Sequence, residues 1–292
     1  MVRTGLRRRL SLAPTAVAVA ALVSVQLTVQ APPAVAVPGV HIVSNSSQPS
    51  SQSLQHAAAH CNAGERVIGG GGQVDNGQGR VMLTALVPGP SFYWVRAHAR
   101  AAGHDDDWRV TAYAICAPES SVPGHHVVAA GSPTSPLTQQ DRTAIAHCPP
   151  GKVVIGTGGA INGKWGQVSF QSIRPNTGGK FVLVQGIRDH QNVAGALFQQ
   201  WSANAFAICA DPIAGRQVVS SLSITHPGDK SQSVQCPNGK TVHGVGFTKD
   251  DPVGHAYVDQ LHPATPLFVF AGAKISGSAI GWNIAAWATC AD

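Results

Sequence analysis

The chain has 292 residues, a formal net charge of +6 and 43% hydrophobic residues. This length suits one large domain or two to three small ones, and the low charge with this hydrophobic content excludes a wholly disordered chain. Four of the 20 Lys and Arg residues lie in the first 36 positions, and no basic cluster follows them in the sequence. We therefore expect no nucleic-acid partner.

The first 36 residues have the three regions of a secretory signal peptide. Arginines at positions 3, 7, 8 and 9 precede the apolar run 16–29, and Ala34-Val35-Ala36 offers a cleavage site before Val37. The apolar run is too short to span a membrane. The sequence predicts a secreted, extracellular protein without a membrane span, and the arginines are compatible with either twin-arginine export or an ordinary leader.

An eleven-residue motif occurs three times in the remaining chain. It begins at Cys61, Cys148 and Cys236, with the pattern C-x2-G-x2-V-x-G-x-G. Counted from these cysteines, Asp or Asn recurs at offset 14, Gly at 18, Leu or Ile at 25 and Pro at 27. Such agreement predicts three copies of one unit, which we place at 37–119, 125–212 and 216–292 and call repeats 1, 2 and 3.

Each repeat contains about six short runs of β-branched and aromatic residues, separated by Gly, Pro and Asn, and none has a helical period. The last run is the most regular, because a Trp stands eight residues before its closing Cys in every repeat (Trp108, Trp201 and Trp282). Both faces of this strand are apolar, which predicts a central strand buried on both sides. The motif glycines leave a trough along their own strand, which we expect the Trp to fill.

Six cysteines in an exported chain indicate three disulfides. The repeats select the pairing of early with late Cys in each unit, namely Cys61–Cys116, Cys148–Cys209 and Cys236–Cys290. A thiolate metal site needs cysteines two to four residues apart, and no such pair occurs. His60 and His147 precede equivalent cysteines, but Gln235 takes that place in repeat 3, so we expect neither a metal nor a cofactor.

Two arrangements suit three small antiparallel β units. They could close around a pseudo-threefold axis in a β-prism-like fold, or stand as three β-sandwiches in a row. The short joints at 118–124 and 211–215 favour close association.

The repeat is similar to those of the vitelline membrane outer layer proteins. The similarity consists of three copies, a strand leading into C-x2-G (Cys148-Pro149-Pro150-Gly151 in repeat 2) and a closing strand that ends in Cys. It implies a β-prism of three Greek-key sheets and a secreted binding role linked to carbohydrate. It transfers no site residues.

No motif for catalysis occurs in the chain. Only Glu65 and Glu119 are glutamates, and G-x-S-x-G, H-E-x-x-H and P-loop patterns are missing from the sequence. We therefore expect no enzyme, and a hydrolase would need an unfamiliar site.

Candidate ligand-binding positions lie in the loops where the repeats differ. They are Asp75, Asn162, Asp250 and the unshared Trp165, which offers a ring for a sugar face but equally a cover for a strand end. The sequence favours a glycan or cell-envelope ligand. The alternative is a structural or protein-interaction module such as an appendage component or an inhibitor. The oligomeric state is open.

Overall fold

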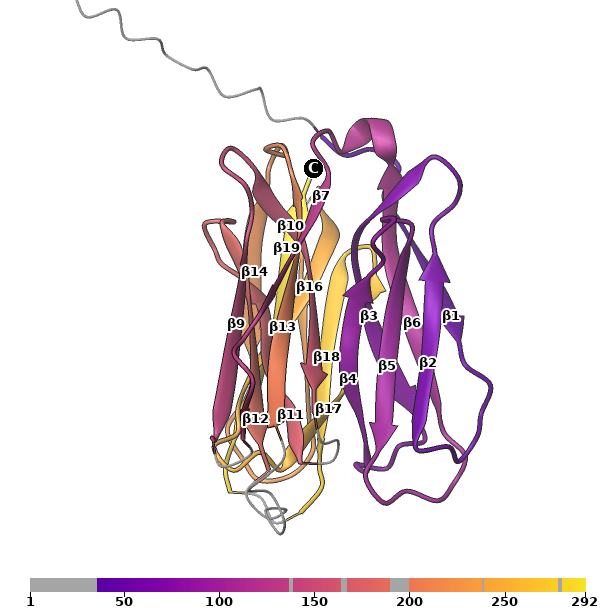
Figure 1. The fold of residues 1–292 in the computed structure, drawn as a ribbon. Helices are drawn as coiled ribbons and strands as arrows, with labels where there is room; N and C mark the ends of the chain where they lie inside the picture. Colours follow the sequence, from indigo (N-terminus) through magenta and orange to yellow (C-terminus); the bar gives the residue numbers. More distant parts are fainter. Residues whose placement is uncertain (1–35, 137–138, 164–166, 190–199, 238, 278–279) are drawn as a thin grey trace, which may run out of the picture. The chain divides into compact units, whose positions relative to one another are not determined.

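Figure 1 shows the computed structural model, which describes residues 36–136, 139–163, 167–189, 200–237, 239–277 and 280–292. The expected signal peptide, except Ala36, falls outside these ranges. The predicted all-β fold is confirmed, because the elements described are strands apart from one 3-10 helix, η1 (Glu119–Ser121). No helix in the described part of the chain is long and apolar enough to cross a membrane.

The strands recur in the same order in each repeat. Repeat 1 contains β1 (His41–Ser46), β2 (Leu54–His60), β3 (Glu65–Asp75), β4 (Val81–Pro88), β5 (Trp94–Ala101) and β6 (Arg109–Pro118). Repeat 2 contains β7 (His126–Gly131), the two-residue β8 (Ser135–Pro136), β9 (Asp141–His147), β10 (Val153–Asn162), β11 (Val168–Pro175), β12 (Phe181–Arg188) and β13 (Gln200–Ala210). Repeat 3 contains β14 (Gln217–Leu222), β15 (Lys230–Gln235), β16 (Thr241–Asp250), β17 (Ala256–Thr265), β18 (Phe268–Ile275) and β19 (Asn283–Ala291).

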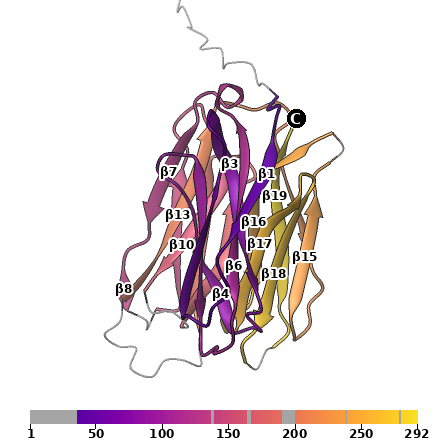
Figure 2. The same cartoon turned by 90° about the vertical axis from the view of Figure 1, so that its right-hand side faces the viewer.

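Each sheet combines three strands from one repeat with three from another. The first sheet has the order β1-β6-β3-β17-β18-β15, the second β2-β5-β4-β10-β13-β7 with β8 beside β13, and the third β14-β19-β16-β11-β12-β9. Figure 2 shows the repeat 3 strands of the first sheet, β17, β18 and β15, side by side. We call the pairs that join two repeats the first seam (β3–β17), the second seam (β4–β10) and the third seam (β11–β16).

The three repeats close around a pseudo-threefold axis. Within each repeat the two three-stranded halves pack against each other, as β5 does on β6, β12 on β13 and β18 on β19. The seams then link repeat 1 to repeat 3, repeat 3 to repeat 2, and repeat 2 back to repeat 1. Each repeat is therefore a small sandwich, and the three sandwiches form a cycle instead of a row.

The motif glycines lie where the backbones of different repeats meet. A Cβ on Gly69 would collide with the carbonyl oxygen of His243, one on Gly156 with that of Ile68, and one on Gly244 with that of Ile155. The expectation that the Trp fills this trough is wrong, because the neighbouring repeat's backbone occupies it. Only glycine allows three strands to approach so closely around an axis.

The tryptophans lie instead between the two halves of each repeat. Trp108, Trp201 and Trp282 are almost completely buried, and the ring of Trp201 packs over Gly186 of β12. Their strands β6, β13 and β19 are interior strands, each with a neighbour on both sides, but each is second from an edge and not at the predicted centre of its sheet. The expectation that both faces are buried is only half right, since Tyr113, Phe206 and Trp287 on the opposite face are half-exposed.

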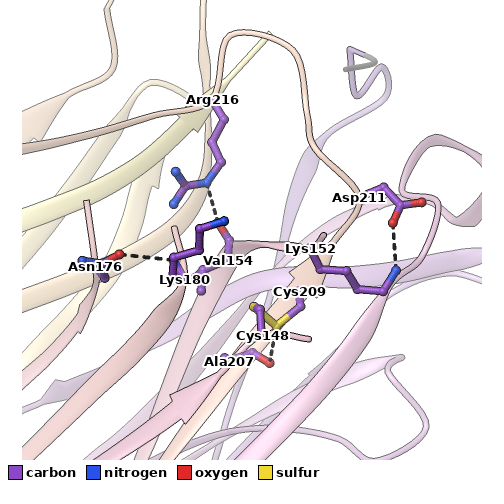
Figure 3. Close-up of a disulfide and its surroundings, with 9 residues drawn as sticks. All are labelled: Cys148, Lys152, Val154, Asn176, Lys180, Ala207, Cys209, Asp211 and Arg216. Atoms are coloured by element: carbon purple, nitrogen blue, oxygen red, sulfur yellow. Dashed lines mark hydrogen bonds and ion pairs between the residues drawn. A yellow bond between two sulfur atoms is a disulfide. The ribbon is translucent and has the colours of Figure 1, made fainter. Parts of the chain in front are cut away.

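The three disulfides have the pairing that the repeats predict. Cys61 is bonded to Cys116, Cys148 to Cys209 and Cys236 to Cys290, with Cα–Cα distances of 5.6, 5.7 and 5.7 Å. Each joins the residue after β2, β9 or β15 to the end of the closing strand β6, β13 or β19, and so links the two halves of one repeat. Figure 3 shows the repeat 2 bond and the neighbouring ion pair of 2.8 Å between Lys152 and Asp211.

Short polar contacts at the disulfide end tie consecutive repeats together. His125, after repeat 1, is hydrogen-bonded through Nε2 to the Val67 carbonyl at 2.7 Å. Arg216, after repeat 2, donates from Nε to the Val154 carbonyl at 2.6 Å (Figure 3). The backbone N–H of Val37 donates to the carbonyl of Asp292 at 2.9 Å, which joins the start of repeat 1 to the end of repeat 3.

Candidate functional site

The turns that vary between repeats lie at the end of the sheets opposite the disulfides, which we call the loop end. In repeat 1 the Ala102 N–H donates to the Arg80 carbonyl at 2.6 Å, which joins the turn after β3 to the turn after β5. In repeat 3 the Ser276 N–H donates to the His255 carbonyl at 2.8 Å in the corresponding place. In these two repeats, the turn that follows the glycine-rich strand therefore lies beside the turn that precedes the closing strand.

The predicted loop residues are divided among the three sheets. Asp75 ends β3 in the first sheet, where it pairs with Arg109 at 2.9 Å. Asn162 ends β10 in the second sheet, and Asp250 ends β16 in the third. Trp165 lies outside the described residues. The three described positions thus belong to three different sheets.

Two of these residues line shallow grooves over the seams. Asn162 borders a groove of about 280 Å³ at the second seam, together with Ala85 and Ala160 from its two strands. Asp250 borders a groove of about 250 Å³ at the third seam, together with Ser172 and Thr248. The seams are thus equivalent in position but differ in chemistry, because each has its own side chains.

The first seam carries three rings side by side, Tyr113, His262 and Phe270, which we call the ring row. The centroids of Tyr113 and His262 are 4.8 Å apart with the planes at 17°, and those of His262 and Phe270 are 5.7 Å apart. All three side chains are half-exposed. The strand register makes the row, because Leu261 pairs with Gly72 and so sets His262 beside Tyr113.

Polar side chains extend the ring row towards the loop end. Tyr113 donates its hydroxyl hydrogen to Gln73 at 2.9 Å, and Gln73 donates from Nε2 to Asp75 at 3.0 Å. The predicted residue Asp75 is therefore the end of a hydrogen-bonded chain that starts at the rings. Rings flanked by amide and carboxylate groups suit a ligand with apolar faces and hydroxyl groups.

A groove of about 250 Å³ adjoins the ring row on β15, β17 and β18. Phe270, Gln260 and Gly272 line it, as do the carboxylates of Asp229 and Asp259. Burial raises the pKa of Asp259 to about 6, although Lys274, 3.9 Å away, opposes this shift. Asp259 can therefore donate a hydrogen bond under mildly acidic conditions as well as accept one.

A buried ion pair lies at the loop end of the third seam, and sequence reasoning missed it. Lys249 is fully buried and donates to Asp251 at 3.1 Å, to Ser169 at 3.2 Å and to the Ala256 carbonyl. Burial lowers the pKa of Lys249, against the effect of Asp251. Burial also opposes ionisation of Asp251, but Lys249 and the Ala256 N–H hold the pKa of that carboxyl below its ordinary value.

A second polar group lies beside this ion pair. Asp189, after β12, accepts a hydrogen bond from the Tyr257 hydroxyl at 3.0 Å and lies 3.4 Å from Nε2 of His255. All three side chains are buried, and burial, followed by the charge of Asp189, raises the pKa of Tyr257. None of these three residues lines a groove described above, and their contacts hold the turn 250–256 against repeat 2.

The repeats contain a signal that could have revealed the buried Lys. Counted from the first Cys, offset 13 holds Val74, Ile161 and Lys249. A charged residue at a position that is apolar in both other copies indicates a buried cation, which needs a partner. Asp251, two residues later, is that partner.

Among the described residues, one group has the spacing of metal ligands: His41, Glu65 and Cys116. The sulfur of Cys116 is committed to its disulfide, which leaves two ligands and no basis for a site. Comparison of the chain with protein-family models and with curated proteins gives no match.

Proposed function

We propose that this chain is a secreted, disulfide-stabilised binding protein without enzymatic activity, and that it recognises a glycan or cell-envelope surface. The observation that carries the proposal is the ring row at the first seam. Tyr113 and His262 stack on each other and Phe270 lies tilted beside them, so the partly exposed row offers one continuous aromatic surface to a sugar. Gln73, Gln260 and Asp259 lie beside them with amide and carboxylate groups for sugar hydroxyls. The three-sheet cycle is also what kinship with the vitelline membrane outer layer proteins would entail, and that kinship is part of the proposal.

The proposal is tested by retention of the purified protein on cellulose, chitin, xylan and isolated cell wall. The variant His262→Val/Phe270→Leu takes its residues from equivalent positions in the other repeats, Val87 and Leu183, so we expect it to fold. Loss of the His262 and Phe270 rings should weaken retention on the bound polymer by about tenfold or more. Phe206→Leu, which removes a half-exposed ring from the second sheet, is the matched control.

Three results would contradict this proposal. If the native protein is retained on none of the four materials, the proposal of a glycan ligand is wrong. If the native protein and the double variant are retained equally, the ring row is not the binding site. Release of shorter saccharides during the incubation would overturn the non-enzymatic assignment and would direct attention to Asp229 and Asp259 in the adjoining groove.

The alternative function, a structural or protein-interaction module, is favoured by one feature of repeat 3. Leu222 and Ile224 are 64% and 78% exposed at the end of β14, which is an edge strand of the third sheet. Exposed apolar residues at a free strand edge are suited to pairing with another chain. Light scattering after size exclusion distinguishes the two functions, because a stable assembly that Leu222→Ser/Ile224→Ser disperses would support the module.

A further inference from the structure

The outward side chains of β5 form a basic face on the second sheet. Arg96, His98 and Arg100 alternate along the strand with buried Val95, Ala97 and Ala99. Alternate residues of a strand share one face, and positions two residues apart lie about 6.6 Å apart along it. His56 of β2 pairs with His98 across the strands, with ring centroids 5.6 Å apart. We call Arg96, His98, Arg100 and His56 the basic face.

Basic side chains are the only charged ones in the described strands of the second sheet. The strands β2, β4, β5, β7, β8, β10 and β13 contain neither Asp nor Glu. By contrast, the first sheet contains Asp75 and Asp259, and the third contains Asp141 and Asp250. The strands of the second sheet therefore differ from those of the other two in having basic but no acidic side chains.

The other two repeats show that the scaffold does not need these residues. By strand pairing, the position of Arg96 is taken by Leu183 in repeat 2 and by Phe270 in repeat 3. The position of His98 is taken by Gln185 and Gly272. Two neighbouring basic residues that no sister repeat requires indicate a role beyond packing.

The surroundings of the basic face suit a long ligand. The guanidinium of Arg96 lies 4.8 Å from the centroid of the half-exposed Trp94 ring, and a stacked guanidinium keeps its in-plane N–H groups for an anion. Next to it, the groove of about 280 Å³ at the second seam is lined by His98 and Arg100 and ends at the predicted loop residue Asn162. A ring, a row of cations and a shallow open groove thus follow one another along one sheet.

The pKa of His98 is affected by the neighbouring residues of the basic face. Burial lowers the pKa of His98, and the positive charges of His56, Arg96 and Arg100 lower it further. Of the two strands beside β5, β4 contributes no charged residue and β2 contributes His56 and His60. A bound anion would favour the protonated imidazole, so binding takes up protons and becomes tighter as the pH falls.

We propose that the basic face and the adjoining second-seam groove bind an acidic polysaccharide, whose carboxylate or sulfate groups pair with Arg96, His98 and Arg100 while a sugar ring stacks on Trp94. Arginine matches planar carboxylate and tetrahedral sulfate groups through paired N–H donors. The flat sheet accommodates an extended polymer without a deep pocket. This site is separate from the ring row, which lies on the first sheet, and either site can fail without the other.

Affinity electrophoresis of the purified protein through gels containing polygalacturonate, dextran sulfate or neutral dextran tests the proposal. We expect an acidic polymer, and not neutral dextran, to retard the protein. The retardation should be stronger at about pH 5.5 than at about pH 7.5. The two acidic gels separate carboxylate from sulfate recognition. Arg96→Leu/His98→Gln installs the residues of repeat 2 and should weaken binding by about tenfold or more.

Arg174→Leu is the matched control, because Arg174 also lies over a ring, 5.5 Å from the Trp287 centroid, but on the third sheet. It should leave the retardation unchanged, as should His262→Val/Phe270→Leu in the ring row. Lack of retardation by both acidic polymers would overturn the proposal. So would equal retardation of native protein and Arg96→Leu/His98→Gln, an equal loss in Arg174→Leu, or stronger binding of a DNA duplex than of either polysaccharide.

Discussion

His243 is a titratable residue at a position that is otherwise apolar. It stands seven residues after its Cys, where repeats 1 and 2 have Ile68 and Ile155, and all three are completely buried near the axis. Neither ring nitrogen of His243 has a hydrogen-bond partner among the described residues. Burial lowers the pKa of His243 to about 4. A neutral imidazole therefore occupies the centre of the fold, and its protonation opposes folding.

The pH dependence of stability should reveal this residue. The unfolded chain binds a proton on His243 near pH 6.5 and the folded chain only near pH 4, so stability is lost as the pH falls between these values. A shift of this size corresponds to about 3 kcal/mol. We expect His243→Ile to remove most of that loss, measured as the free energy of unfolding in urea at both ends of the range. Parallel pH profiles of variant and native protein would contradict the assignment.

Strand β16 differs from its counterparts β3 and β10 at its second-last residue. Those strands carry Val74 and Ile161 where β16 carries Lys249, and the ion pair with Asp251 compensates for the buried charge. A buried pair of this kind is costly to break from one side but can often be replaced as a whole. The third seam is therefore held by charge where the other two are held by apolar packing.

Substitution by the residues of repeat 1 tests this difference. Lys249→Val alone leaves Asp251 buried without its cation and should destabilise the fold by about 3–5 kcal/mol. Lys249→Val/Asp251→Asn installs the combination of Val74 and Asn76 and should recover most of that loss. Denaturant unfolding of both variants is the measurement. A double variant no more stable than the single one would show that the cation itself is required.

The elements could be predicted from the sequence largely because three copies could be compared. Counting forward from Cys61, Cys148 and Cys236 aligned several strand positions without gaps, and counting back from each closing Cys identified the buried tryptophans. The repeats then selected the disulfide pairing. The exchange of half-sheets between repeats could not be found in this way, because every repeat has the same pattern and so the pattern does not say whose strand is the partner. The glycine positions were recognised, but a missing Cβ does not identify the backbone that approaches it.

The candidate surfaces were less predictable than the strands. Asp75, Asn162 and Asp250 were identified as equivalent, but the exchange of strands that assigns each to a different sheet could not be read from the sequence. The basic face escaped notice because Arg96, His98 and Arg100 are separated by small apolar residues and form no continuous charge run. Their spacing of two, read on a strand, does place them on one face. The ring row depended on pairing between β3 and β17, which are distant in the sequence.

Two kinds of contact hold the molecule together: those within one repeat and those between repeats. The three disulfides are each confined to one repeat, so they stabilise the individual sandwiches and do not join them. The joining depends on the seams, each of which has two paired positions in register, on the close glycine contacts at the axis and on the polar contacts at the disulfide end. Loss of a seam would therefore separate intact repeats and expose the glycine strands.

The hydrogen bond between Val37 and Asp292 holds the start of repeat 1 beside the end of repeat 3. Because the two ends of the repeats touch, a circular permutant can connect them by a short linker and begin instead at Gly124, in the exposed joint after Pro123. We expect this permutant to form the same three disulfides, checked by peptide mapping without reduction, and to melt within a few degrees of the native protein. Failure to form them would mean that repeat 1 must fold first. With them formed, no repeat is structurally first or last, and each sheet can acquire its own surface without regard to its place in the gene.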